Sequence, residues 1–215
     1  MTLKYLYMTL GTILSASACC DANGSHSNIP ENEKTNIPAS QRTVLVAYFS
    51  WSGTTQRIAE EIARLTNGTL FRIEPMTPYP SEYEPCTEVA KAERDENRRP
   101  AIKNKIIDFD RYDTIFIGCP VWWHTAPMII HTFLEEPTYH FKGKTVIPFC
   151  TYAATYRDET LTRMVELTPD SLHLRGFGNS GDVRQVAPWL RAIGILPEAP
   201  VNSNVSNARP RREAE

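Results

Sequence analysis

The sequence predicts an α/β fold of the doubly wound, three-layer type, in which a five-stranded parallel sheet lies between two layers of helices. Two observations carry this prediction. Apolar runs of strand length alternate five times with segments whose apolar residues recur at helical spacing. The first run, VLVAYF at 44–49, has no charged or amide side chain, which is typical of a strand buried on both faces of a parallel sheet.

The other elements follow in order along the chain. A helix is predicted over 55–65, because Ile58, Ile62 and Leu65 fall on one face and Gly68 ends it. Four further strands are predicted at 69–73, 114–118, 145–149 and 171–177. Four further helices are predicted at 87–97, 128–134, 158–167 and 183–193, with an irregular Pro/Tyr-rich stretch at 75–85.

The folded unit is predicted to span residues 42–196. The segments on either side, 19–41 and 197–215, hold few large apolar side chains. They cannot bury enough surface to offset the chain entropy that folding costs. We therefore expect a disordered tether before the domain and a disordered tail after it.

Residues 1–18 have the features of an export signal. Lys4 precedes a short apolar stretch, and the small residues Ala16-Ser17-Ala18 fit the cleavage pattern. Cys19 and Cys20 follow at once, a pattern that resembles bacterial lipoproteins, in which the cysteine thiol is acylated. The sequence predicts an exported protein, periplasmic or anchored in the membrane by a lipid at Cys19 or Cys20. The alternative is release of a soluble protein by the ordinary signal peptidase.

The composition excludes several classes of protein. The 25 acidic residues nearly balance the 23 Lys and Arg residues, and the net charge of −2 disfavours a nucleic-acid binder. No uncharged apolar run reaches the length of a transmembrane helix. Five cysteines are too few for a disulfide scaffold of this size, and no Cys/His spacing indicates a zinc site. Cys119 and Cys150 end consecutive predicted strands, but we expect single buried thiols.

Ligands of doubly wound sheets bind beyond the carboxyl ends of the strands, so the loops that leave the strands are candidate sites. The first loop, SWSGTT at 50–55, leads into a helix whose free N–H groups suit a phosphate. Its hydroxyls and its glycine are candidate phosphate ligands: Ser50, Ser52, Gly53, Thr54 and Thr55. The alternative is that these residues only cap the helix. The Gly-Lys-Ser/Thr ending of a Walker loop is missing, which disfavours nucleotide hydrolysis.

The second loop, 119–127, contains the adjacent tryptophans Trp122 and Trp123 between two prolines. Packing alone explains two adjacent indoles poorly, and their rings are suited to stack against a flat ligand. The alternative is that one of them covers a helix. For His124, ligand contact and no contact are equally open. The third loop, 150–156, is a candidate because it follows the next strand and should face the other two.

A glycine pattern near the C-terminal end has a different interpretation. GFGNSG at 176–181 matches the G-x-G-x-x-G fingerprint of dinucleotide-binding loops. That fingerprint belongs in the first turn of a βαβ unit, with an acidic residue on a later strand, and the chain offers no later strand here. We therefore interpret these residues as flexible loop glycines.

Taken together, the segments VAYFSWSGTTQRIAEEI, PYPSEY, ENRRPAI, YDTIFIGCPVWWHTAP and GKTVIPFCTY resemble a flavodoxin-like family of bacterial proteins. The resemblance covers nearly all of 42–196. It implies a sheet of strand order 2-1-3-4-5 and a non-covalently bound FMN. By position, it implies phosphate ligands at Ser50, Ser52, Gly53, Thr54 and Thr55. It implies ring contacts at Pro120, Val121, Trp122, Trp123, Thr151 and Tyr152.

Two stretches depart from the family pattern. His124, a candidate ring contact, stands where such a loop usually has glycine, and 153–156 replaces a Gly/Ser-rich third loop. Tyr156 would narrow the ring site or stack on it. These departures bear on the affinity and redox potential of FMN more than on the fold.

The resemblance implies a redox protein that uses FMN to transfer electrons outside the cytoplasm, with a redox partner that the sequence does not identify. Two alternatives stay open. One is an FMN-dependent NAD(P)H-quinone or small-molecule reductase in which His124 and Tyr156 contact substrate. The other is a cofactor-free binding module. The near-neutral charge disfavours a soluble shuttle of the strongly acidic kind, which docks on basic partners.

Overall fold

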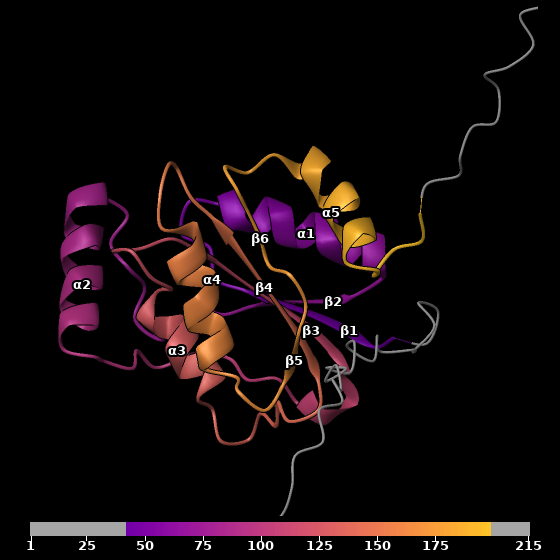
Figure 1. The fold of residues 1–215 in the computed structure, drawn as a ribbon. Coiled ribbons are helices and arrows are strands. Elements are labelled where there is room, and N and C mark those ends of the chain that lie inside the picture. The colour runs from indigo at the N-terminus through magenta and orange to yellow at the C-terminus, as the bar shows by residue number, and fades with distance from the viewer. Residues whose placement is uncertain (1–41, 199–215) are drawn as a thin grey trace, which may run out of the picture. The chain divides into compact units, whose positions relative to one another are not determined.

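Figure 1 shows the computed structural model, which describes residues 42–198. The predicted signal at 1–18, the tether at 19–41 and its anchor cysteines Cys19 and Cys20 lie outside the described residues, as does the tail from 199 on. Within 42–198, no helix is both long and apolar enough to cross a membrane.

The centre of the fold is a parallel sheet with four main strands: β1 (Val44–Tyr48), β2 (Thr69–Arg72), β3 (Thr114–Pro120) and β4 (Thr145–Thr151). The order across the sheet is β2-β1-β3-β4-β5, with β5 (Leu172–His173) at the edge. All residues of β1 and β4 are buried, as expected of central strands covered on both faces. The observed order confirms the predicted fold class and the strand order that the family resemblance implies.

Helices cover both faces of the sheet and give three layers (Figure 1). α1 (Thr54–Thr66) and α5 (Val186–Ala192) pack on one face, and α3 (Met128–Leu134) and α4 (Arg157–Glu166) pack on the other. α2 (Tyr83–Asp95) lies on the α3 side, at the margin of the sheet. Two short 3-10 helices complete the described elements, at Phe109–Arg111 and Val183–Gln185.

The fifth predicted strand, 171–177, is interrupted in the structure. β5 pairs with the start of β4, and a separate strand β6 (Phe177–Asn179) pairs with its end. The register between these two pairings changes by one residue, because Val146 lies opposite His173 whereas Phe149 lies opposite Phe177. Pro148 of β4, which has no N–H to donate, lies at the interruption. An extra residue in the edge strand at that point forms a bulge.

The second helix begins earlier than the sequence pattern predicts. α2 starts at Tyr83 rather than at 87, so that Pro85 lies in its first turn. A proline is tolerated there because the first N–H groups of a helix have no partner within the helix. The interpretation of 75–85 as wholly irregular was therefore wrong at its end, and this shift brings one more turn of helix to the functional site.

Candidate functional site

A cavity of about 640 Å³ opens at the carboxyl ends of β1, β3 and β4. Its volume lies within the range typical of small-molecule sites. The first three loops predicted from the sequence all contribute to it, together with one side of α2. The lining residues from the predicted site are Ser52, Thr54, Pro120, Val121, Trp122, Trp123, His124, Thr151 and Tyr152.

The loop after β1 has the geometry of an anion-binding turn. Gly53 is the N-cap of α1 and has a left-handed backbone (φ 87°), which its lack of a side chain permits. Its N–H donates to Ser50 Oγ at 3.1 Å, so that the Ser50 hydroxyl shapes the loop from inside. The Ser52 and Thr54 hydroxyl oxygens are 3.3 Å apart, and both residues line the cavity. The phosphate assignment of these residues stays a prediction.

Thr55 and Thr151 form a junction beneath the cavity. Thr55 is buried, and its Oγ1 lies 2.7 Å from Thr151 Oγ1. The Thr151 carbonyl also accepts a hydrogen bond from Val121 N at 2.9 Å. The start of α1, the end of β4 and the loop after β3 are therefore joined through one residue. Thr55 supports the cavity from below, whereas Ser52 and Thr54 face it.

The loop after β3 turns back through a two-residue hairpin. Trp122 and Thr125 exchange backbone hydrogen bonds of 3.0 and 3.1 Å. The two residues between them, Trp123 and His124, both have positive φ, at 47° and 71°. This is the pattern of a type I′ turn, which favours Asn-Gly. The turn accounts for the glycine that the family resemblance implies at position 124. Here two non-glycine residues occupy it, and each costs about 1–2 kcal/mol of backbone strain.

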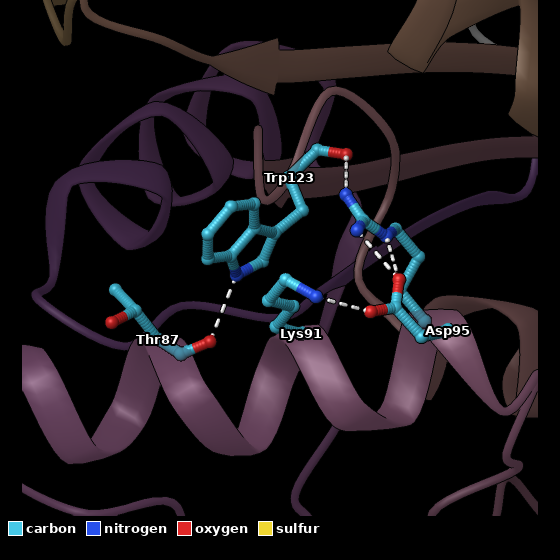
Figure 2. Close-up of polar contacts among 5 residues, drawn as sticks. Thr87, Lys91, Asp95 and Trp123 are labelled. Atoms are coloured by element: carbon cyan, nitrogen blue, oxygen red, sulfur yellow. Dashed lines mark hydrogen bonds and ion pairs between the residues drawn. The ribbon is translucent and has the colours of Figure 1, made fainter.

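The two tryptophans of this loop have different roles. The Trp122 ring meets Phe49 and Tyr79 edge to face, with centroid distances of 5.2 and 5.0 Å. Trp122 is thus held by the core while it lines the cavity. Trp123 instead lies over α2, and its Nε1 donates to the Thr87 carbonyl at 2.8 Å (Figure 2). Trp123 thus covers a helix and also lines the cavity, and its predicted ring contact stays a prediction.

Charged side chains of α2 hold Trp123 in place. Arg94 and Lys91 lie over its ring, 5.2 and 5.9 Å from the centroid, and Arg94 also donates to the Trp123 carbonyl. Asp95 accepts from both cations, and Figure 2 shows its contact with Lys91. This arrangement fixes the loop after β3 against α2.

The family model described as Flavodoxin matches residues 43–190 of the chain. The chain belongs to the flavodoxin family. The match spans every strand of the described sheet and ends within α5, and it therefore includes every loop that borders the cavity. The comparison with curated proteins finds no match.

Three solved flavodoxin-like structures are similar to the chain. A flavoprotein from Bacteroides eggerthii DSM 20697 has 37% identity and a TM-score of 0.61, over 70% of this chain and 97% of that one. A flavoprotein from Bacteroides uniformis ATCC 8492 has 34% identity and a TM-score of 0.62, over 70% of this chain and 98% of that one. A flavoprotein in complex with FMN from Lactobacillus acidophilus NCFM shares the fold, with 24% identity and a TM-score of 0.58, over 68% and 99%.

The departures from the flavodoxin pattern meet in space. The rings of His124 and Tyr156 stack, with centroids 3.6 Å apart and planes inclined by 21°. Tyr156, like His124, has a positive φ, of 64°, and its carbonyl accepts two hydrogen bonds from Thr160 at the start of α4. His124 lines the main cavity, whereas Tyr156 lines a neighbouring one of about 460 Å³. The pair thus forms a wall between the two cavities.

Seven further residues line the cavity of this flavodoxin-family protein and were not predicted from the sequence: Trp51, Tyr83, Cys86, Thr87, Ala90, Ala153 and Ser180. Four of them recur along one side of α2 at helical spacing, a signal hidden by starting that helix at 87. Ser180 follows β6, within the glycine pattern interpreted as a flexible loop. That interpretation was wrong for Gly178, which is a strand residue paired with Cys150.

The thiols near the cavity, among the described residues, are buried. Cys119 and Cys150 are register partners on β3 and β4. Burial raises the pKa of the Cys150 thiol to about 12 and holds the pKa of Cys119 well above its ordinary value. Burial also raises the pKa of Cys86, which lines the cavity. Since the thiolate is the reactive form, these thiols are suited to packing rather than to nucleophilic chemistry.

Proposed function

We propose that this flavodoxin-family protein binds FMN non-covalently and uses it to transfer electrons outside the cytoplasm. One observation carries the proposal: a single cavity joins a hydroxyl-rich loop at the start of α1 to aromatic loops after β3 and β4. Phosphate is suited to the first end and a flat ring to the second. The FMN complex of the Lactobacillus acidophilus protein of the same fold supports this choice of flavin.

The residues fit the parts of FMN in order. The N–H groups at the start of α1 and the hydroxyls of Ser52 and Thr54 would hold the phosphate. Trp122 and Tyr152 would flank the ring from the two aromatic loops, and Thr151 would fix the distance between the loops. FMN supplies the redox chemistry when bound, while the protein orients it and excludes water.

The first test is whether the protein retains flavin. We expect the visible absorbance of FMN to remain with the protein after incubation and desalting. A protein that retains no flavin under these conditions would instead be the cofactor-free binding module.

Replacing the two cavity-facing hydroxyls should weaken FMN binding. Each lost hydrogen bond costs roughly 0.5–1.5 kcal/mol, so the double variant Ser52→Ala/Thr54→Ala should bind FMN about 30-fold more weakly. Quenching of flavin fluorescence in a titration measures this. Thr66→Ala is the matched control, because its hydroxyl bonds to Ile62 O at the far end of α1. Unchanged affinity in the double variant would refute the phosphate-loop assignment.

Export and lipid attachment are part of the proposal and are supported by the sequence pattern at 1–20. We expect the mature protein, expressed in a bacterial host with lipoprotein processing, to begin at Cys19 or Cys20 and to carry acyl chains. Mass spectrometry of the N-terminal peptide measures this directly. An unmodified cysteine at the mature N-terminus would leave the protein exported but soluble, and a retained Met1 would contradict export.

A second candidate function is an FMN-dependent small-molecule reductase. The extension of the cavity to α2, beyond the loops that would hold FMN, favours it. Steady turnover of NAD(P)H with a quinone by the FMN-loaded protein would support the reductase. Reversible one-electron reduction without such turnover would support the electron carrier.

A further inference from the structure

We propose that the α2 side of the cavity is a binding subsite for an uncharged, planar aromatic molecule that lies beside the flavin. The inference rests on the proposed function and names the class of molecule that would exchange electrons with FMN. It starts from one side of α2, where Tyr83, Cys86, Thr87 and Ala90 line the cavity. None of these four residues belongs to the loops that the family pattern assigns to FMN.

The subsite has no charge to offer a ligand. Among the described residues that line the cavity, none is Asp, Glu, Lys or Arg. On the adjacent α2, Lys91 and Arg94 bind Asp95, and Glu93 accepts from the Tyr79 hydroxyl at 2.8 Å. The two other charged residues of α2, Glu84 and Glu88, do not line the cavity. A charged ligand would lose its hydration there without gaining a counter-ion, whereas an uncharged ring pays no such cost. This disfavours a pyridine dinucleotide, whose pyrophosphate needs partners.

Aromatic side chains border the mouth of the subsite. Tyr83 is 71% exposed and Trp123 is 37% exposed, although both line the cavity. Large aromatic residues gain free energy when another ring covers them, by their buried area and by about 0.5–1.5 kcal/mol of ring–ring interaction. Cys86 and Ala90 are buried at the base, where their small side chains leave room for a flat molecule.

The wall that α2 forms is held rigidly before any ligand binds. Trp123 fastens α2 to the loop after β3, as described above. On the other side, Trp51 Nε1 donates to the Pro80 carbonyl at 2.9 Å and ties the segment before α2 to the phosphate loop. Arg99, just after α2, pairs with Glu135 after α3. A preformed wall lowers the entropy cost of binding a rigid ring.

The test fills the subsite and leaves the flavin loops untouched. The probe is 2,3-dimethyl-1,4-naphthoquinone, whose methyl groups block addition of the Cys86 thiol, and the readout is quenching of tryptophan fluorescence, with and without bound FMN. Ala90→Phe should weaken probe binding at least tenfold. Val89→Phe is the matched control, because Val89 neighbours Ala90 but is 39% exposed and does not line the cavity. Its probe affinity should equal that of the unaltered protein.

A second variant guards against a folding defect in Ala90→Phe. Tyr83 is exposed, so that Tyr83→Ala leaves the core intact. This variant should bind the probe severalfold more weakly. Unchanged probe affinity in both variants would overturn the subsite. An equal loss of FMN affinity in Ala90→Phe would overturn it too, because α2 would then line the flavin itself. If NADPH binds more tightly than the probe and Ala90→Phe abolishes NADPH binding, the proposal that the subsite takes an uncharged ligand would be overturned. If the protein binds the probe but not FMN, and Ala90→Phe abolishes probe binding, the subsite is supported and the FMN proposal is contradicted.

Discussion

Gly118→Ala is expected to destabilise the protein by about 3 kcal/mol, since overpacking a tight core typically costs 1–3 kcal/mol and occasionally more. Gly118 lies on β3 opposite Phe149 of β4, and an added Cβ would overlap the Phe149 ring. The ring is fully buried under α1 and α5 and has no free space to move into. For a domain of this size, the melting temperature should fall by roughly 10 °C.

The same clash predicts a specific rescue. A smaller residue at 149 makes room for the new methyl group, so Gly118→Ala/Phe149→Leu should be less unstable than the sum of the two single variants. Urea unfolding of the four proteins measures the coupling free energy. Strict additivity would show that the two side chains do not compete for space.

His131 is expected to make the protein less stable in mild acid. It is buried on α3, and within the described residues neither ring nitrogen has a hydrogen-bond partner. Burial, together with the Arg163 and Arg99 charges and against the opposing charge of Glu135, lowers the pKa of His131 to about 4 from an ordinary value of 6.5. Between pH 4 and pH 6.5, the His131 side chain is therefore protonated in the unfolded chain but not in the folded protein.

The sign of the effect follows from this difference. The stabilising contribution of neutral His131 is complete above pH 6.5, is lost as the pH falls toward 4, and is constant below that. The loss amounts to about 3 kcal/mol for one such group. His131→Phe should remove this part of the pH dependence, as measured by urea unfolding across the interval. Thr132→Ala, on the same helix, should keep it. An unchanged slope in His131→Phe would show that His131 titrates alike in both states.

The sheet could be predicted from the sequence because its strands carry their own signals. The apolar runs that became β1, β3 and β4 are buried on both faces, so their side-chain pattern needed no knowledge of neighbours. The edge was harder to predict. The break between β5 and β6 depends on Pro148 of a different strand, and no local pattern within 171–177 reports it.

The candidate site was predictable loop by loop but not as a three-dimensional arrangement. The sequence indicated which loops carry the hydroxyls and the indoles. It could not separate Ser52, which faces the cavity, from Thr55, which bonds to Thr151 beneath it. It also could not show that His124 and Tyr156 stack, since 31 residues, including α3 and β4, separate them along the chain. Such contacts depend on tertiary structure, which spacing alone does not encode.

The hydroxyl pair of Thr55 and Thr151 has a consequence for how the site responds to its contents. The two hydroxyl groups carry two hydrogens, and only one of them lies between the two oxygens. Either Thr55 donates to Thr151, or Thr151 donates to Thr55. The second hydrogen therefore belongs to Thr55, at the start of α1, or to Thr151, beside the aromatic loops. Rotation of the two C–O bonds reverses the direction of this hydrogen bond with no change in the backbone. Thr151, which lines the cavity, can therefore act either as a donor or as an acceptor toward a molecule in the cavity.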